Sequence, residues 1–290
     1  MRSLAPLRPW REVVRDLPGD RLVEVRGQRF HVSRDGAGPP LVLLHGIAAS
    51  SYSYRDLIPL LAPGFETIAI DLSGFGKTER PRDVESYRIE EQADRIARLL
   101  DELGGDRVSI VGHSFGAAVA ACLASRHPGR VEKLALVSPV TEFRKAPWFW
   151  RNWVGLRIAY GGVRLLLSDS DRFRRAIRNS FYREGILTRQ VADHYRESML
   201  VEGFREAFFG YAKALGGRGA HIPGYEKLAH SILVIAGEKD GIVTVDACER
   251  LVSSLHDGRL FVVPSCGHSA PEEAPEAVVS ALGAFLGSPG

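Results

Sequence analysis

The chain has 290 residues, of which 45% are hydrophobic and 25% are charged. This composition is that of an ordinary globular protein, with room for one large domain or two small ones. The net charge of +3 is too small to indicate nucleic-acid binding, and no run of about 18 apolar residues predicts a membrane span. The N-terminal residues show no secretory signal, and three scattered cysteines show no disulfide framework. We therefore expect a cytoplasmic protein that binds no nucleic acid and has no transmembrane segment.

Short β-type runs alternate with helical stretches along most of the chain. Several of these runs are apolar throughout, which suits central strands of a sheet that is covered on both faces. The first two alternate in polarity and suit an antiparallel hairpin at one edge. The pattern predicts an α/β sandwich with right-handed crossovers. The predicted strands are Arg21–Val25, Arg29–Ser33, Leu41–Leu44, Glu66–Ile70, Val108–Val111, Lys133–Val137, Ile232–Ala236 and Arg259–Val263, and the predicted helices are Tyr52–Leu61, Ile89–Leu103, Phe115–His127, Val245–Leu255 and Pro275–Leu286.

One interval of about ninety residues, from Val140 to Ala229, interrupts this alternation. It has no convincing core strand, it is helical in character, and it is rich in arginine and aromatic residues. An inserted helical cap between two core strands accounts for the interruption. We therefore predict a cap of residues 140–229 within a core of residues 1–139 and 230–290.

Three tryptophans, Trp148, Trp150 and Trp153, lie close together in the predicted cap. They could line an apolar substrate pocket, touch a membrane surface, or pack the cap onto the core. The basic excess of the same segment would attract an anionic substrate, or it forms a solvated helix face.

The run Gly112-His113-Ser114-Phe115-Gly116 follows an apolar strand and precedes a stretch rich in small residues. This order predicts a strand, a sharp turn and a helix. A Gly-x-Ser-x-Gly turn in that context exposes the serine hydroxyl to a substrate carbonyl. Glycines at 112 and 116 avoid clashes where the turn approaches neighbouring backbone. Ser114 is therefore the candidate nucleophile.

A serine hydroxyl needs a histidine base, and the histidine needs an acid that fixes its tautomer and stabilises its cation. Asp240 lies in the turn that follows the seventh predicted strand, and His268 lies in the loop after the eighth. The chain order Ser114, Asp240, His268 is that of one known triad arrangement. Glu238 and Glu142 remain alternatives for the acid.

These residues, with His45-Gly46 after the third strand and Asp71–Gly76 after the fourth, make the chain resemble the α/β-hydrolase fold family. The resemblance is to its cap-bearing branch, which includes esterases, carbon–carbon bond hydrolases and haloperoxidase-like enzymes. It implies a mostly parallel eight-stranded sheet flanked by helices, with a helical cap inserted after the sixth strand.

The resemblance also implies an oxyanion hole made by two backbone N–H groups, which by position belong to Ile47 and Phe115. His45 is similar to the family histidine that shapes its turn, and His113 is either structural or a pocket liner. We nevertheless keep both histidines, with Trp148, Trp150 and Trp153, as candidate substrate-binding residues.

Gly76-Lys77-Thr78 resembles the end of a phosphate-binding loop. That motif requires a glycine five positions before Gly76, where this chain has Asp71. We therefore expect no nucleotide. No His, Cys or carboxylate spacing indicates a metal, so we expect neither a metal nor another cofactor.

The resemblance also bears on the reaction. Epoxide hydrolases and haloalkane dehalogenases of this family use a carboxylate at the nucleophile position, where this chain has Ser114, so the resemblance argues against both. It favours hydrolysis of a carboxylic ester or related acyl compound, through an acyl-enzyme on Ser114 and a water activated by His268. The alternatives are a carbon–carbon hydrolase or an acyltransferase or cyclase of a small-molecule pathway that uses the same site, and a non-catalytic ligand-binding member. Hydrolases of ring-cleavage products often carry an aromatic residue after the histidine, whereas Ser269 stands here. We expect an apolar small-molecule acyl substrate, and a homodimer remains an option.

Overall fold

The computed structural model describes residues 4–15, 20–141, 153–216 and 224–287. Within these ranges eight strands form one sheet in the order β1-β2-β4-β3-β5-β6-β7-β8. β2 pairs antiparallel with β1 and β4, and the other neighbours pair in parallel. The predicted mostly parallel sheet with an N-terminal hairpin is therefore confirmed. The strands are β1 (Asp20–Val25), β2 (Gln28–Asp35), β3 (Pro40–Leu44), β4 (Glu66–Ile70), β5 (Val108–His113), β6 (Val131–Val137), β7 (Ser231–Gly237) and β8 (Asp257–Val263).

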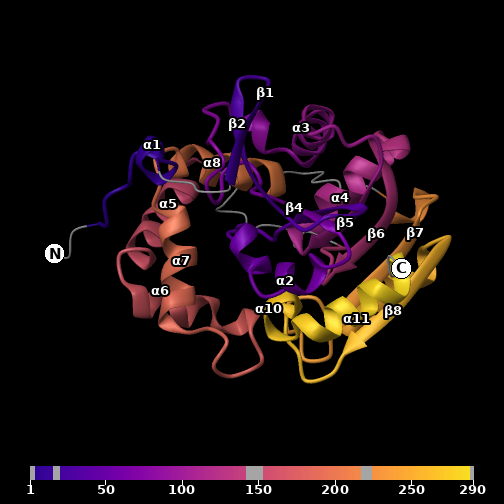
Figure 1. Cartoon of the computed structure of the whole chain (residues 1–290). Helices are drawn as coiled ribbons and strands as arrows, with labels where there is room; N and C mark the ends of the chain where they lie inside the picture. Colours follow the sequence, from indigo (N-terminus) through magenta and orange to yellow (C-terminus); the bar gives the residue numbers. More distant parts are fainter. Residues whose placement is uncertain (1–3, 16–19, 142–152, 217–223, 288–290) are drawn as a thin grey trace.

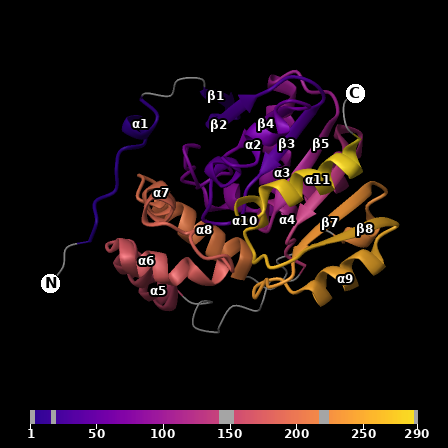
Figure 2. The same cartoon turned by 60° about the horizontal axis from the view of Figure 1, so that its bottom comes forward.

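Helices cover both faces of the sheet, because successive side chains of a strand point to opposite faces. In β3, Val42 and Leu44 join a buried cluster that includes side chains of α3, α4 and α9. Leu41 and Leu43 join a second cluster with side chains of α11 and the end of α2. Figure 2 shows α9 and α11 on opposite sides of β7 and β8. The core helices are α2 (Ile58–Leu61), α3 (Ile89–Glu102), α4 (Phe115–Arg126), α9 (Val245–Ser254) and α11 (Pro275–Leu286), with the short helices α1 (Trp10–Val13) and α10 (Ala270–Glu273).

The predicted helix Tyr52–Leu61 is wrong as a single element. A 3-10 helix, η1 (Ser51–Tyr54), is followed by the short helix α2. Pro59 has no N–H to donate to the carbonyl of Arg55, and its ring would clash with that carbonyl in a continuous helix. The short helices α1 and α10 went unpredicted because four residues are too few to show a helical period.

Between β6 and β7 the described chain forms four α-helices, which lie together at one end of the core (Figure 1). Ten buried side chains from this region, including Phe173, Phe181 and Tyr195, form their own cluster, which packs against Ala48, Ala49 and Tyr52 of the core. We call this group the inserted helices: α5 (Trp153–Leu166), α6 (Ser170–Ile177), α7 (Arg189–Met199) and α8 (Phe204–Gly216). No helix in the described ranges combines the length and the hydropathy needed to cross a bilayer.

Tyr211 attaches α8 to the core. Its hydroxyl donates a 2.6 Å hydrogen bond to the carbonyl of Ser73, and its ring stacks on Phe75 at a centroid distance of 4.8 Å. The ring also meets the edge of Phe115, at 5.4 Å. The preceding residue is glycine because a Cβ at Gly210 would lie 2.1 Å from the ring of Tyr87. The position of α8 is thereby tied to the residue that follows Ser114.

We expect Tyr211→Phe to lower the free energy of unfolding by about 1–2 kcal/mol, because the buried Ser73 carbonyl loses its donor while the ring packing remains. Tyr211→Ala should cost more, about 3–5 kcal/mol, through the cavity that it leaves. Urea unfolding measures both. Tyr182→Phe is the matched control, since the Tyr182 side chain is half exposed. Equal losses for Tyr211→Phe and Tyr182→Phe would contradict this account.

Candidate active site

Ser114 occupies a strained turn between β5 and α4, with φ of 52° and ψ of −113°. Two glycines make this turn sterically feasible. A Cβ at Gly116 would lie 2.1 Å from the carbonyl oxygen of Leu44, and one at Gly112 would lie 2.6 Å from the Cα of Ala117. Real Cβ atoms do not approach backbone so closely. The helix can therefore begin directly against the sheet, with Ser114 at the tip of the turn.

The structure brings Ser114, His268 and Asp240 together at the carboxyl edge of the sheet, where parallel strands end side by side. The Oγ of Ser114 lies 3.0 Å from Nε2 of His268, and Nδ1 of His268 lies 2.8 Å from Oδ2 of Asp240. The other oxygen of Asp240 accepts the N–H groups of Ile242 and Val243 at 2.7 and 2.9 Å. All three residues are at most 7% exposed. This is the geometry of nucleophile, base and orienting acid.

The electrostatics of the site favour an ionised Asp240. Burial by itself would raise the pKa of Asp240, but the hydrogen bond and the charge of His268, with the two backbone N–H groups, lower it below the usual value. The resulting carboxylate can only accept, so it holds the proton of His268 on Nδ1. The lone pair of Nε2 is then directed at the Ser114 hydroxyl, from which it can remove a proton.

The alternative acid Glu238 makes other contacts in the described structure. Glu238 is exposed, its Oε2 accepts the N–H of Ser265 at 2.8 Å, and its Oε1 pairs with Lys239 at 3.1 Å. Glu142 lies outside the described residues. The contact to the ring of His268 is therefore made by Asp240.

The two amides expected to form an oxyanion hole flank Ser114. A Cβ on Gly46 would lie 3.3 Å from the Cβ of Ser114, so the chain that enters Ile47 runs beside the nucleophile. Phe115 is the first residue of α4. Its N–H is one of the four at a helix N-terminus without an intrahelical partner, where the helix dipole favours negative charge. Both positions suit stabilisation of an oxyanion.

The two candidate histidines have different environments. His45 is fully buried, its Nδ1–H donates to the carbonyl of Gly46 at 2.7 Å, and its Nε2 accepts the N–H of Leu72 at 2.9 Å. It does not line the cavity beside Ser114, so the prediction that it contacts the substrate is wrong, and its role is structural. His113 does line that cavity, and its Nε2–H donates to the carbonyl of His268 at 2.8 Å. Burial, helped by the neighbouring His268, lowers the pKa of His113 to about 3, so its ring is neutral at physiological pH.

A cavity of about 200 Å³ opens beside Ser114 and His268. Sequence reasoning missed most of its wall, because the side chains come from several separate segments, among them α6 and α7, and carry no local motif. Only Glu272 could have been noticed, since it lies four residues after His268. Of the candidate tryptophans, Trp148 and Trp150 lie outside the described residues, and Trp153 begins α5 without a described side chain. The missed lining residues include Ser53, Phe173, Ile177, Ser180, Phe181, Tyr195, Ile242 and Glu272.

Glu273 fixes the loop that carries His268. Its Oε1 accepts the N–H groups of Gly267 and Ser269, at 3.1 and 3.3 Å, and its Oε2 accepts those of Tyr182 and Arg183, at 2.8 and 2.7 Å. The carboxylate therefore joins the loop on both sides of His268 to the chain between α6 and α7. In the described part of the chain, no group of three or more His, Cys, Asp or Glu is arranged to hold a metal ion.

The lowered pKa of Asp240 predicts a pH dependence of stability. A carboxyl whose folded pKa lies below its unfolded value of about 3.9 stabilises the fold above that pH and loses this contribution as the pH falls through the folded pKa. The stability advantage of the wild type over Asp240→Asn should therefore shrink as the pH is lowered from about 5 into this acid range. Urea unfolding across that range measures it, and an advantage independent of pH would contradict it.

Comparison with known proteins places this fold and site in a family. A model described as the alpha/beta hydrolase fold matches residues 39–275. The 2-hydroxymuconate semialdehyde hydrolase of Pseudomonas sp. (strain CF600) is 30% identical over 92% of this chain and 93% of its own length. Among solved structures, the epoxide hydrolase CorEH has a TM-score of 0.77 at 26% identity, covering 92% of this chain and 98% of its own. The 2-hydroxy-6-oxo-6-phenylhexa-2,4-dienoate hydrolase of Rhodococcus sp. strain RHA1 has a TM-score of 0.74 at 27% identity. The match covers 92% of this chain and 99% of that protein. The chain therefore belongs to the alpha/beta hydrolase fold family.

Proposed function

We propose that this protein is a serine-dependent hydrolase of an uncharged acyl compound, in the first place a carboxylic ester. The observation that carries the proposal is the continuous path from Asp240 through His268 to Ser114, with contacts of 2.8 and 3.0 Å at the wall of a cavity. A polarised serine hydroxyl that faces such a cavity is suited to attack on a carbonyl carbon.

In the proposed reaction, Nε2 of His268 takes the proton of Ser114 as Oγ bonds to the carbonyl carbon. The N–H groups of Ile47 and Phe115 stabilise the oxyanion, each by roughly 3–4 kcal/mol. His268 then gives the proton to the leaving alcohol, and an acyl-enzyme remains. A water molecule, deprotonated by His268, attacks the acyl carbon. The Ser114 oxygen leaves, recovers its proton from His268, and the carboxylic acid is released.

The same chemistry argues against the epoxide hydrolase activity that some relatives carry in their names. Displacement at an sp³ carbon by the Ser114 oxygen would form an ether, which has no carbonyl for a water molecule to attack. A carboxylate nucleophile would instead form an ester, which can be hydrolysed. Ser114 therefore favours substrates with an acyl carbonyl.

Carbon–carbon bond hydrolysis is the second candidate, and the resemblance to the semialdehyde and dienoate hydrolases favours it. The substrates named for those proteins carry a carboxylate. The described lining of the cavity contains no lysine or arginine, and the charged side chain on it is the carboxylate of Glu272. An uncharged ester therefore suits the described cavity better than an anionic ring-cleavage product.

We expect the protein to hydrolyse short uncharged p-nitrophenyl esters and to be labelled by a fluorophosphonate, because both reactions begin with attack by Ser114. Ser114→Ala should abolish labelling and reduce kcat by a factor on the order of 10⁶. Release of p-nitrophenol and mass spectrometry of the labelled protein provide the measurements. A wild type that is neither labelled nor active on esters would exclude the proposed function, and cleavage of a dienoate alone would favour the second candidate.

Asp240→Asn should lower kcat by about 10⁴-fold with little change in fold, because asparagine no longer holds the His268 proton on Nδ1. Glu238→Gln is the matched control and should leave kcat within about twofold, since Glu238 contacts Ser265 and Lys239 rather than His268. Steady-state kinetics on one ester, with circular dichroism as the check on folding, measures both. A larger loss in Glu238→Gln than in Asp240→Asn would reverse the assignment of the acid.

A further inference from the structure

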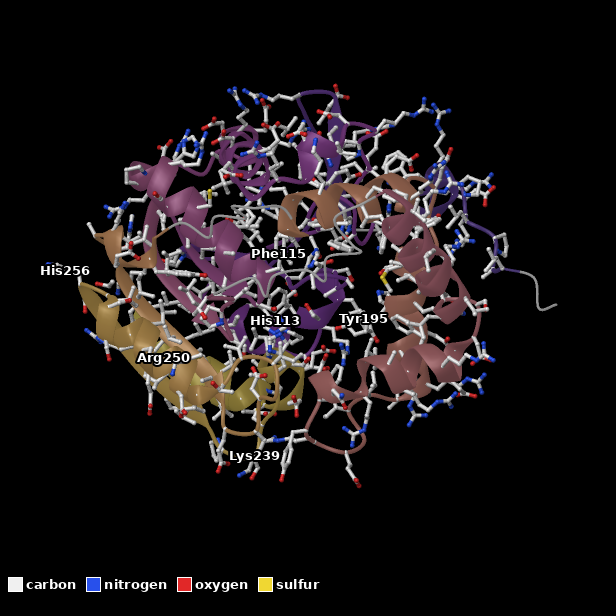
Figure 3. All side chains as sticks on the ribbon, turned by 180° about the vertical axis from the view of Figure 1, so that it is seen from behind. His113, Phe115, Tyr195, Lys239, Arg250 and His256 are labelled. Atoms are coloured by element: carbon white, nitrogen blue, oxygen red, sulfur yellow. The ribbon has the colours of Figure 1, made fainter. Side chains whose placement is uncertain are left out.

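A buried charged group lies in the wall of the catalytic cavity, away from the triad. Glu272 on α10 is 5% exposed and lines the cavity together with Tyr195 of α7. Oε1 of Glu272 accepts the hydroxyl of Tyr195 at 2.7 Å, and Oε2 accepts Nη1 of Arg55 at 2.5 Å. Figure 3 shows Tyr195 on the side of the inserted helices that is turned toward His113 and Phe115. The proposed mechanism uses none of these three groups.

The Arg55–Glu272 pair presents its carboxylate, and not its guanidinium, to the catalytic cavity. Glu272 lines the catalytic cavity, whereas Arg55 lines a second cavity of about 370 Å³, whose wall also includes Tyr52. The guanidinium is held there by the carbonyl of Tyr52 at 3.2 Å, by Asp56 at 3.3 Å, and by the face of the Tyr52 ring at 4.4 Å. A molecule in the catalytic cavity therefore meets the carboxylate rather than the guanidinium.

The wall formed by Glu272 and Tyr195 offers acceptors. An ionised carboxylate has no proton to donate and about four lone-pair sites, of which the contacts above occupy two. The Tyr195 hydroxyl uses its single proton on Glu272, so only its oxygen lone pairs remain. Burial raises the pKa of Glu272, and the Arg55 guanidinium and the Tyr195 hydroxyl oppose this rise. A substrate group placed against this wall gains most if it donates a hydrogen bond.

We propose that Glu272 and Tyr195 form a subsite for a hydrogen-bond donor, so that the enzyme selects uncharged acyl substrates that carry a hydroxyl group and rejects those that carry a carboxylate. This inference rests on the proposed function, whose substrate class it narrows. Its physical basis is the difference between three substrate groups. A hydroxyl donates to the buried carboxylate of Glu272, whereas a methyl group leaves the remaining acceptors without a donor. A carboxylate adds a second buried negative charge.

The experiment compares phenyl esters of graded acyl length whose chains end in a methyl, a hydroxyl or a carboxylate group. At the acyl length that reaches Glu272, we expect the wild type to favour hydroxyl over methyl about tenfold or more in kcat/KM, and to act on the carboxylate ester least. In Glu272→Gln the ratio of hydroxyl to methyl should fall toward one, and the carboxylate ester should gain relative to both. Ratios within one variant cancel any general loss of activity.

Removal of Glu272 alone leaves Arg55 without its buried partner, so the variant can lose stability. The double variant Arg55→Met with Glu272→Leu removes both charges and should show the same loss of hydroxyl preference. Glu79→Gln is the matched control, because Glu79 pairs with Arg29 at 3.2 Å on another part of the molecule. It should keep the wild-type ratios. A wild type without hydroxyl preference at any length, or variants that keep the preference, would overturn the inference.

A binding measurement separates this inference from the proposed function. Unreactive methyl ketones that end in a methyl or a hydroxyl group are titrated calorimetrically into the wild type and Glu272→Gln. Tighter binding of the hydroxy ketones that depends on Glu272, without turnover of any ester, would support the subsite and exclude the esterase. Ester turnover without any such binding preference would support the esterase and exclude the subsite.

Discussion

The close approach of β3, β5 and α4 is the constraint on which the rest of the site depends. Leu44 and Gly116 are so near that a single methyl group would overlap the Leu44 carbonyl, and this contact forces Ser114 into a backbone conformation that serine rarely adopts. The strain is balanced by the packing of a sheet buried on both faces. It keeps the hydroxyl at the tip of the turn, where the Ile47 loop and the start of α4 flank it.

Parallel strand topology explains how residues far apart in sequence become one site. β5, β7 and β8 end at the same edge, so the loops that follow them deliver Ser114, Asp240 and His268 to one place. Glu273 holds the last of these loops in place, since its carboxylate accepts four backbone N–H groups, two of them from this loop. The same carboxylate connects the loop to the inserted helices, so the base and the cavity wall are held by one residue.

Charge is distributed unevenly around the cavity. His113 beside the nucleophile is neutral, and the described lining holds the carboxylate of Glu272 and no cation. Arg55, which does not line this cavity, pairs with that carboxylate. An unpaired charge would be costly in a buried site, and the pairing of Glu272 with Arg55 avoids this cost. The carboxylate still offers hydrogen-bond acceptors to the cavity. Most of the side chains that line this cavity contribute no motif to the sequence.

The sequence by itself determined the sheet and the order of its strands along the chain, and it predicted that Ser114, Asp240 and His268 form one site, because periodicity and glycine-bounded turns are local properties. Pro59 is visible in the sequence as a residue that interrupts a helix, whereas the sequence could not show that both nitrogens of His45 are occupied by backbone. The tertiary structure alone decided that Tyr195, Arg55 and Glu272 meet. Their contacts span 77 and 217 positions, and such long-range pairing is set by how α7, α10 and the residue after η1 pack together rather than by any local pattern.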